Sequence, residues 1–361
     1  MPESHTSDFR RNDIAQTLIK EIRVKSKKQI RLMEVCGTHT MSVFKHGVRS
    51  VLPETITLLS GPGCPVCVTS QSEIDAFIKL ADEKDVIITT FGDLLRVPGS
   101  NASLHHKKAE GADIRIVYSS MDALDIAKKK PQKTIVFPGI GFETTAPGTA
   151  ATILAAEKAG IKNFCVLSAQ KTVPPALFGL MNIPGVQVDG FLLPGHVSVI
   201  IGEDAYRPFV ESSGLPCVIA GFEPVDILAG ILQLVTKIES GDSGLVNAYK
   251  RAVLPEGNPK AREILYSVFE PADARWRGIG NIPESGLVFK ETFKAFDPLT
   301  RFSLSIPESE EIKGCACGEI LTGLKIPPEC ALFRKKCTPI NPIGPCMVST
   351  EGTCAAYYKY Q

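Results

Sequence analysis

Between about residues 12 and 232, short apolar runs alternate with helical stretches, and this rhythm limits the fold more than any other feature. Most runs are continuously apolar, which is typical of strands that helices cover on both faces. The pattern therefore predicts βαβ units in open, doubly wound parallel sheets, an α/β fold. The expected strands are 30–35, 55–59, 86–91, 114–118, 134–138, 164–168, 190–193 and 217–220. The expected helices are 72–83, 121–130, 149–160 and 223–240.

Changes in composition along the chain suggest three parts. The lysine-rich segment 127–134 indicates a boundary between two α/β lobes, over residues 25–130 and 131–238. Beyond about residue 240 prolines and glycines multiply, so a small domain with little regular structure is expected over 239–361, stabilised by a metal. A helix over 8–24 would pack on that domain or on the first lobe.

The overall charge excludes some classes of partner. Forty Lys and Arg side chains against thirty-nine Asp and Glu give a net charge of +1, with no basic run, so nucleic acid is not an expected partner. The N-terminus has no apolar secretory core, and no uncharged stretch is long enough to span a bilayer. We therefore expect a cytoplasmic protein that does not bind membranes.

The chain contains eleven cysteines, and in a reducing compartment these favour metal binding or redox catalysis over structural disulfides. Cys165 and Cys217 lie within apolar strands, where a buried and inert thiol is expected. The last forty-seven residues hold six cysteines and no histidine, so ligation by thiolates alone is predicted. Zinc and iron–sulfur clusters both accept four thiolates, but two close CxxC pairs are absent and the gaps are uneven. This spacing favours a [4Fe–4S] cluster held by several loops.

Three further cysteines follow two predicted strands. Cys36 comes after 30–35, and Cys64 and Cys67, in the sequence CPVC, come after 55–59. Because ligands bind beyond the carboxyl ends of strands in such sheets, both loops should open into one crevice. A helix starting near residue 70 could lower the pKa of a CPVC thiol. A redox disulfide and a metal clamp both fit this pair, and the third cysteine argues against an incidental pair.

Other predicted strand ends carry polar side chains that could take part in catalysis. His39 follows Cys36, Glu143 lies in GIGFETT, and His196 follows the strand at 190–193. The histidines are candidate ligands or proton carriers, and buried structural histidines are the alternative. GIGFETT lacks the full dinucleotide fingerprint, and the chain has no Walker A sequence.

Six motifs together resemble the HypD family, whose members are maturation factors of [NiFe]-hydrogenases. The resemblance covers nearly the whole chain. The motifs are MEVCGTHT at 33–40, GPGCPVC at 61–67, FGDLLRVPGS at 91–100, GFETTAP at 141–147, PGHVSVIIG at 194–202 and CMVSTEGTCAAYYKY at 346–360.

This resemblance implies an assembly role. Members of the family pair with the small chaperone HypC, and together the two proteins carry an iron that acquires two cyanides and one carbon monoxide. Cyanide comes from HypE, which HypF charges, and the Fe(CN)2CO unit passes to the hydrogenase large subunit. By this resemblance Cys36 would bind the transient iron, as a soft donor alongside a cysteine of HypC.

The family pattern C-x14-C-x6-C-x16-C matches four cysteines here, which the resemblance makes the [4Fe–4S] ligands: Cys315, Cys330, Cys337 and Cys354. Cys317 and Cys346 then remain as a redox pair, similar to the arrangement in ferredoxin:thioredoxin reductase. Spacing alone does not separate Cys315 from Cys317. The implied protein is a redox-active scaffold rather than a conventional turnover enzyme. A cluster-dependent thiol–disulfide reductase and a zinc-stapled binding module are the alternatives.

Overall fold

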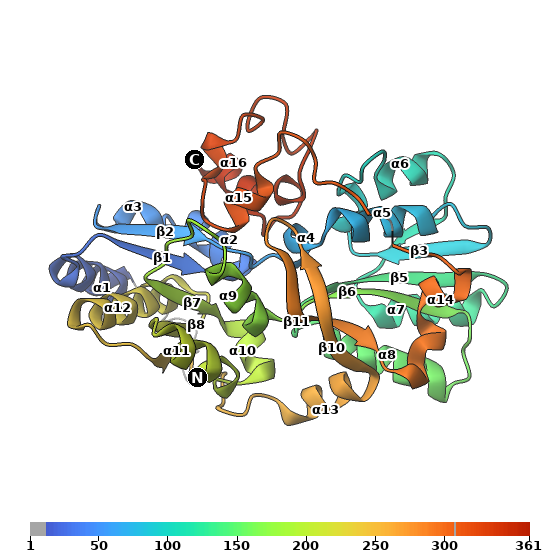
Figure 1. Cartoon of the computed structure of the whole chain (residues 1–361), viewed down its shortest axis with the longest axis horizontal. Helices are drawn as coiled ribbons and strands as arrows, with labels where there is room; N and C mark the ends of the chain where they lie inside the picture. Colours follow the sequence, from blue (N-terminus) through green and yellow to red (C-terminus); the bar gives the residue numbers. More distant parts are fainter. Residues whose placement is uncertain (1–11, 307) are drawn as a thin grey trace, which may run out of the picture.

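The computed structural model describes residues 12–306 and 308–361, so residues 8–11 of the predicted N-terminal helix lie outside it. Two parallel sheets lie side by side, with a long antiparallel hairpin between them and the C-terminal region above their junction (Figure 1). This confirms the predicted α/β class with two lobes. No described helix is long and apolar enough to cross a membrane.

The first lobe is built on a five-stranded parallel sheet in the order β2-β1-β7-β8-β9. Its strands are β1 (Ile30–Glu34), β2 (Ile56–Ser60), β7 (Gly190–Pro194), β8 (Cys217–Ala220) and β9 (Leu245–Asn247). Successive residues of each strand point to opposite faces, so Leu32 packs under one helical layer and Met33 under the other. Both faces are therefore buried, as the continuous apolar runs predicted.

Helices cover the two faces of the first lobe. One layer contains α1 (Asn12–Lys25), α2 (Gly37–Lys45), α3 (Val48–Val51) and α12 (Pro224–Ser240). The other contains α9 (Val173–Met181), α10 (Gly195–Ile201) and α11 (Arg207–Ser213), with η3 (Asp204–Tyr206) before the last. Helix α1 packs against α12, so the N-terminal helix belongs to the first lobe and not to the cysteine-rich region.

The second lobe is built on a four-stranded parallel sheet in the order β4-β3-β5-β6. Its strands are β3 (Val86–Thr90), β4 (Ile114–Ile116), β5 (Thr134–Gly141) and β6 (Phe164–Gln170). Its helical elements are α5 (Gln71–Leu80), η2 (Leu94–Arg96), α6 (Leu104–Ala109), α7 (Ser120–Lys129) and α8 (Ala146–Lys158). All eight predicted strands are present, and each start lies within one residue of the expected position.

The predicted boundary between lobes 25–130 and 131–238 is wrong. Strand β3 pairs with β5 across that boundary, in the register Val86↔Thr134, so the lysine-rich segment is the end of α7 and the loop that leads to β5, inside the second lobe. Strand β1 instead pairs with β7, in the register Met33↔Phe191. The chain leaves the first lobe after β2 and returns to it with β7, because parallel strands are joined by long crossovers and need not pair in chain order.

The predicted C-terminal domain over 239–361 also begins too early. Strand β9 belongs to the first lobe, and the antiparallel hairpin of β10 (Phe269–Trp276) and β11 (Gly280–Phe289) packs between the lobes. The elements around the hairpin are α13 (Pro259–Val268), η4 (Glu291–Phe296) and α14 (Pro298–Phe302).

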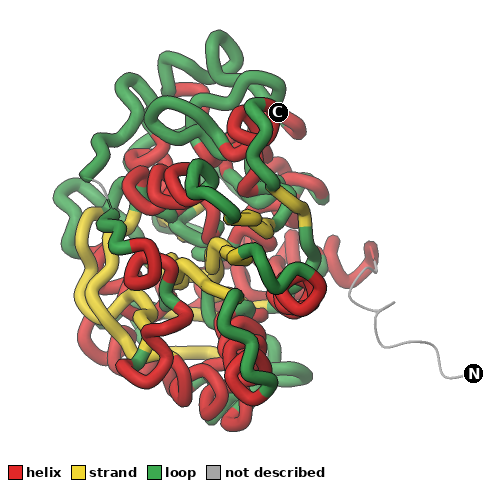
Figure 2. The backbone as a smooth tube through the Cα atoms, turned by 90° about the vertical axis from the view of Figure 1, so that its right-hand side faces the viewer, coloured by secondary structure: helices red, strands yellow, loops and turns green. Residues whose placement is uncertain are grey.

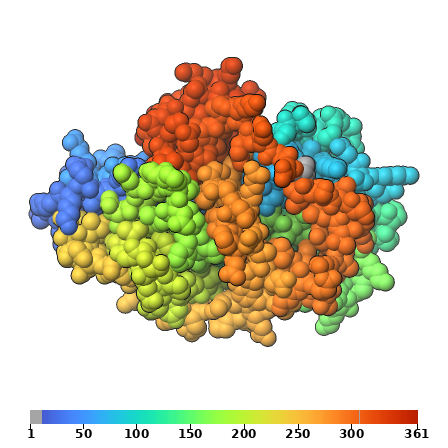
Figure 3. All heavy atoms as spheres, viewed as in Figure 1, coloured from blue at the N-terminus to red at the C-terminus, as the bar shows by residue number. Residues whose placement is uncertain are grey.

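The cysteine-rich region after α14 has little regular structure, as predicted. It contains only short helical pieces, which are α15 (Cys317–Leu321), η5 (Pro327–Glu329), η6 (Pro345–Met347) and α16 (Thr353–Tyr360). Loops dominate this end of the molecule in the rotated view (Figure 2). The region packs over the junction of the two lobes, as the space-filling view shows (Figure 3). This places its cysteines near the loops that follow β1 and β2.

Candidate functional site

The loops after β1 and β2 meet at one edge of the first lobe. The strands pair in the register Glu34↔Ser60, so both end at the same level. Cys36 then caps α2, and the Gly37 N–H donates to the Gly63 carbonyl at 2.8 Å. The prediction that these loops share a crevice is confirmed, since Cys36, Gly63 and Pro65 line one cavity.

Gly63 should tolerate no side chain. A Cβ there would lie 2.1 Å from the Cys36 backbone nitrogen, and a backbone atom cannot move aside as a side chain can. We expect Gly63→Ala to cost about 3 kcal/mol or more, at the upper end of ordinary overpacking. Thermal unfolding should show a midpoint several degrees lower. Gly92→Ala is the matched control, because nothing lies within 4 Å of that position, and an equal loss there would contradict the close approach.

The cavity has a volume of about 480 Å³ and is walled by all three parts of the molecule. Thr38 on α2 donates to the Glu351 carboxylate of the cysteine-rich region at 2.7 Å, which ties that region to the first lobe beside Cys36. The lining residues are Cys36, Thr38, Gly63, Pro65, Phe142, Thr144, Thr145, His196, Val197, Val199, Ile200 and Glu351. A small ligand bound at Cys36 would therefore contact all three parts of the molecule, in a cavity that opens to solvent.

Cys36 is a neutral thiol in this environment. Burial raises its pKa to about 12, and the nearby carboxylates of Glu351 and Glu34 act in the same direction. The backbone N–H groups of His39 and Thr38 oppose this without overcoming it. Binding a metal at Cys36 would displace the thiol proton, so the site becomes a thiolate when its ligand arrives.

Glu34 is a buried carboxyl at the end of β1 that the sequence analysis missed. It accepts hydrogen bonds from the Cys36 N–H at 3.1 Å and from the Thr40 hydroxyl at 2.5 Å. Burial raises its pKa to about 7, and the hydrogen bonds of Thr40 and Ser60 oppose the rise. Glu34 thus fixes the turn that presents Cys36. The available signal was an acidic residue in the predicted strand, two positions before Cys36.

The two candidate histidines have different positions. His196 lines the Cys36 cavity and stacks on Phe222 with ring centroids 3.9 Å apart, and burial lowers its pKa. His39 is fully buried, with its Nε2 donating to the Gly221 carbonyl at 2.9 Å, and it does not line the cavity. Burial lowers the His39 pKa to about 4, so its ring is neutral. His196 is therefore placed to contact a ligand, and His39 fits the structural alternative.

Glu143 lies outside the Cys36 cavity, although its neighbours Phe142 and Thr144 line it. Its Oε1 accepts the Val173 N–H at 2.8 Å, and its Oε2 has no partner among the described residues. Burial raises its pKa to about 7. The carboxyl faces a separate cavity of about 250 Å³ that also contains Tyr266. The structure does not bring Glu143 together with Cys36.

The raised pKa of Glu143 predicts a pH-dependent stability. Between pH 4.5 and about 7 the native carboxyl holds a proton that the unfolded chain has lost, so its contribution to stability falls as the pH rises through this window. Glu143→Gln keeps the acceptor and removes this titration. We expect equal stability near pH 4.5 and a gain of about 1–3 kcal/mol for the variant at pH 8, measured by urea unfolding. A variant equally destabilised at both pH values would show that burial does not raise this pKa.

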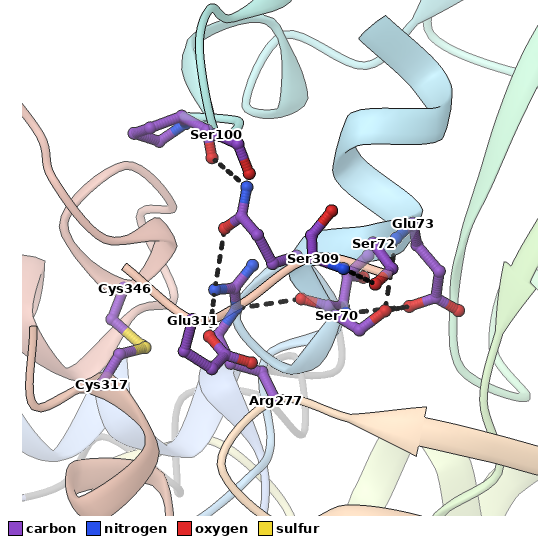
Figure 4. Close-up of polar contacts among 12 residues, drawn as sticks. Ser70, Ser72, Glu73, Ser100, Arg277, Ser309, Glu311, Cys317 and Cys346 are labelled. Atoms are coloured by element: carbon purple, nitrogen blue, oxygen red, sulfur yellow. Dashed lines mark hydrogen bonds and ion pairs between the residues drawn. The ribbon is translucent and has the colours of Figure 1, made fainter. Parts of the chain in front are cut away.

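Cys64 and Cys67 begin a continuous line of sulfur atoms. Cys64 caps the one-turn helix α4 (Pro65–Val68), and its Sγ accepts the Cys67 N–H at 3.3 Å. The Cys67 thiol contacts Cys346, whose Sγ lies 2.9 Å from that of Cys317 (Figure 4). Cys317 in turn contacts Cys315. The predicted pair of Cys317 and Cys346 thus lies between CPVC and the other C-terminal cysteines.

The predicted lowering of a CPVC thiol pKa is not found at Cys67. Burial raises the Cys67 pKa well above its ordinary value, and the contact with Cys346 opposes this only in part. The helix predicted from about residue 70 is present as α5, which begins at Gln71 with Ser70 as its N-cap, but a separate single turn, α4, already begins within CPVC. One turn of helix has too small a dipole to offset full burial.

The four cysteines of the predicted cluster set lie in one neighbourhood. The pKa of Cys354 is raised by burial first and then by Cys315, Cys337 and Cys330, so these three side chains lie near Cys354. The Ile343 N–H donates to the Cys337 Sγ at 3.3 Å, the kind of bond that stabilises a ligating thiolate. Within residues 12–306 and 308–361, no three Cys, His, Asp or Glu side chains converge as a preformed site for a single ion. The donor chemistry and the N–H bond to sulfur fit an iron–sulfur cluster.

Arg277, at the tip of the β10–β11 hairpin, is a second residue that the sequence analysis missed. Its side chain is only 2% exposed and donates to the Thr69 carbonyl at 3.0 Å, to Gln71 at 3.2 Å and to Glu311 at 2.6 Å (Figure 4). The hairpin tip thus joins the segment after CPVC to the cysteine-rich region. No signal in the sequence distinguished Arg277 from a surface arginine.

Comparisons with known proteins identify the same family as the six sequence motifs. The family model described as "HypD: Hydrogenase formation hypA family" matches residues 13–361. The chain is 44% identical over 366 residues to the hydrogenase maturation factor HypD2 of Bradyrhizobium diazoefficiens, covering 99% of this chain and 96% of the relative. It is 43% identical over 365 residues to HypD of Azotobacter vinelandii, covering 99% and 96%. It is 43% identical over 366 residues to HypD of Cupriavidus necator, covering 99% and 97%.

Proposed function

The chain belongs to the HypD family of hydrogenase maturation factors, and we propose that it is a redox-active scaffold for assembly of the Fe(CN)2CO unit of [NiFe]-hydrogenase. In this proposal HypC is the partner that shares the iron, HypE supplies cyanide, and the hydrogenase large subunit receives the product through HypC. The iron and its ligands are cargo. The protein's own resident group is a [4Fe–4S] cluster.

The observation that carries this proposal is the cavity at Cys36, which both lobes and the cysteine-rich region line. A thiolate is a soft, strong donor of the kind that iron needs when it binds cyanide and carbon monoxide. The cavity walls come from both lobes and from the cysteine-rich region, and the cavity opens to solvent, so a partner's thiolate could approach an iron bound at Cys36. Burial raises the Cys36 pKa and holds the thiol neutral until a metal displaces its proton.

Two polar side chains of the cavity wall would orient the cargo. His196 is exposed on α10 and stacks on Phe222, so its ring nitrogens can donate to or accept from a ligand on the iron. Glu351 accepts the Thr38 hydroxyl and lies close enough to Cys36 to raise the pKa of its thiol. The cavity thus offers one metal ligand and two groups that can hydrogen-bond diatomic ligands.

The C-terminal cysteines would supply electrons to this site. Cys315, Cys330, Cys337 and Cys354 would hold the [4Fe–4S] cluster, which when bound provides electrons one at a time. Cys346 contacts both Cys317 and Cys67, so it connects the redox pair with CPVC. CPVC follows directly after Gly63, which touches Cys36.

The thiol–disulfide reductase is the second candidate. It would use CPVC on an external disulfide and would not need Cys36. The Cys67 side chain is fully buried and that of Cys64 is 3% exposed, so neither thiol can reach a disulfide on another protein in this conformation. This burial favours the scaffold. The scaffold and the reductase would both absorb visible light through their iron–sulfur cluster, whereas a zinc-stapled module would not, because zinc is colourless. Visible absorption of anaerobically purified protein therefore separates these two functions from the zinc-stapled module.

Infrared spectroscopy of the chain purified together with HypC tests the proposal. Bands in the cyanide and carbon monoxide stretching regions are expected, because the complex would carry the partly or fully assembled iron unit. Absence of both bands from a complex that contains iron would contradict the scaffold function.

A further prediction of this proposal is that Cys317 and Cys346 exchange between dithiol and disulfide. Their sulfurs lie 2.9 Å apart, so little movement is needed to form the bond. Thiol labelling of the cluster-loaded chain, unfolded in the labelling reagent before and after mild reduction, should show these two cysteines changing state together. Cys217, a buried thiol in β8, is the internal control and should be labelled equally in both samples. Identical labelling of the pair in both samples would remove the relay from the proposal.

A further inference from the structure

The row of cysteines that runs from Cys64 to Cys315 also borders a second pocket, which is separate from the Cys36 cavity. A pocket of about 240 Å³ lies beside Arg277. It is lined by Arg277, Gly278, Glu311, Ile312, Cys315, Cys317, Gly318, Glu319, Thr322, Leu324 and Gly344. Cys317 is therefore the member of the redox pair that faces this pocket. Cys346 does not line the pocket, and its side chain contacts Cys67 instead.

We propose that this pocket admits a low-molecular-weight thiol, which reduces the Cys317–Cys346 disulfide by attacking Cys317. This inference rests on the redox pair of the proposed function. It adds the chemical class of the reductant and the side from which the reductant approaches.

The reaction is thiol–disulfide exchange in two steps. The thiolate of a first small thiol bonds to the Cys317 sulfur, the Cys317–Cys346 bond breaks, and Cys346 leaves as a thiolate that takes up a proton. A second small thiol attacks the sulfur of the first, which releases Cys317 as a thiol and a small symmetric disulfide. Two small thiols are oxidised, and two electrons and two protons reach the cysteine pair.

The pocket has the size for this reactant. Its volume is below the roughly 300–1,000 Å³ of typical drug-sized ligand sites, which suits a molecule of a few heavy atoms. Cys317 is only 5% exposed, so a sulfur on the surface of a folded protein cannot reach it. Arg277 pairs with Glu311 in the pocket wall, and its Nη2 has no hydrogen-bond partner among the described residues.

The wall of the pocket is closely packed. A Cβ on Gly278 would lie 2.1 Å from the Gly318 Cα, so the hairpin tip is pressed against the helix that carries Cys317. A Cβ on Gly344 would lie 2.7 Å from the Cys315 Sγ. Widening the pocket for a larger reductant would therefore require moving backbone.

The first test blocks the pocket at its rim. Leu324 lines the pocket and is 41% exposed, whereas Ile326 is 40% exposed and does not line it. Leu324→Trp and Ile326→Trp are thus matched substitutions on the same surface. The full, cluster-loaded chain with its pair oxidised is mixed anaerobically with 2-mercaptoethanesulfonate, and the new thiols are counted over time. We expect Leu324→Trp to slow the reduction at least about tenfold, and Ile326→Trp to react as fast as the unmodified chain.

The second test identifies the attacked sulfur. In Cys346→Ser, Cys317 is left with a free thiol, and in Cys317→Ser the same holds for Cys346. Each cluster-loaded variant is treated with the disulfide of 2-mercaptoethanesulfonate, and mass spectrometry follows the mixed disulfide. Cys317 should be modified at least about tenfold faster than Cys346, because only Cys317 faces the pocket. The iron content of both variants confirms that they retain their fold.

The outcomes separate this inference from the proposed function. If the wild-type pair forms no disulfide, the relay fails and this inference fails with it. If the pair is redox-active but Leu324→Trp reacts at the wild-type rate, or Cys346 is modified as fast as Cys317, only the access through this pocket is overturned. A pair that a protein dithiol reduces and small thiols do not would likewise overturn only this inference.

Discussion

Replacing Cys337 with alanine should remove the iron–sulfur cluster and unfold much of the cysteine-rich region. The described residues of this region form only the short helical pieces α15, η5, η6 and α16, so cluster ligation would supply a large share of its folding free energy. The variant should lack the brown colour, retain almost no iron, and show rapid protease cleavage after about residue 303. Cys330→Ala should have the same effect, because all four ligands are needed.

Cys165→Ala is the matched control for this experiment. Cys165 is a fully buried thiol in β6, outside the cysteine-rich region. Its loss should cost about 1 kcal/mol through a small cavity and leave iron content unchanged. If Cys337→Ala retained about four irons per chain, the assignment of the cluster ligands would be refuted. If Cys165→Ala lost its iron as well, the loss would reflect general unfolding.

Replacing Cys36 with serine should abolish the cyanide and carbon monoxide bands of the complex with HypC. A serine oxygen is a much poorer donor to low-spin iron than a thiolate. The substitution keeps the size of the side chain and leaves the hydrogen bond from its backbone N–H to Glu34 in place, so the fold should persist. Infrared spectroscopy is the measurement, and cells that rely on the variant should contain hydrogenase large subunit without its iron centre.

The cluster serves as the control for Cys36→Ser. Its visible absorption should be unchanged, because Cys36 lies at the end of β1 and the cluster cysteines lie in separate loops. A Cys36→Ser complex with bands at full intensity would move the iron site elsewhere, with Cys64 and Cys67 as the remaining strand-end thiols. Loss of both the bands and the cluster would mean that the variant had misfolded.

The helices and strands were largely predictable because they depend on local pattern. A run such as 217–220 (Cys-Val-Ile-Ala) is apolar at every position, as expected for a strand that is buried on both faces. The meeting of Cys36 with the CPVC loop was predictable too, because the carboxyl ends of adjacent parallel strands lie at one edge. The cysteine-rich region was recognised from its composition alone.

The division of the chain into lobes was not predictable in this way. Strand β1 pairs with β7, more than 150 residues later, and β3 pairs with β5 across the lysine-rich segment. An apolar strand can pair with many other apolar strands, so its own sequence does not specify which strand lies next to it in the sheet. The partners are chosen by how the crossovers and the helical layers pack, which is a property of the whole molecule.

The amino-acid sequence by itself determined the chemistry of this protein: thiolates at two strand ends, a histidine-free set of cysteines, and the motifs of its family. Only the tertiary structure decided which of these groups meet. It placed His196 in the Cys36 cavity, left His39 and Glu143 outside it, and brought Arg277 beside Cys317. Residue type fixes what a side chain can do, but burial and distance depend on contacts between segments far apart in the chain, which no local pattern records.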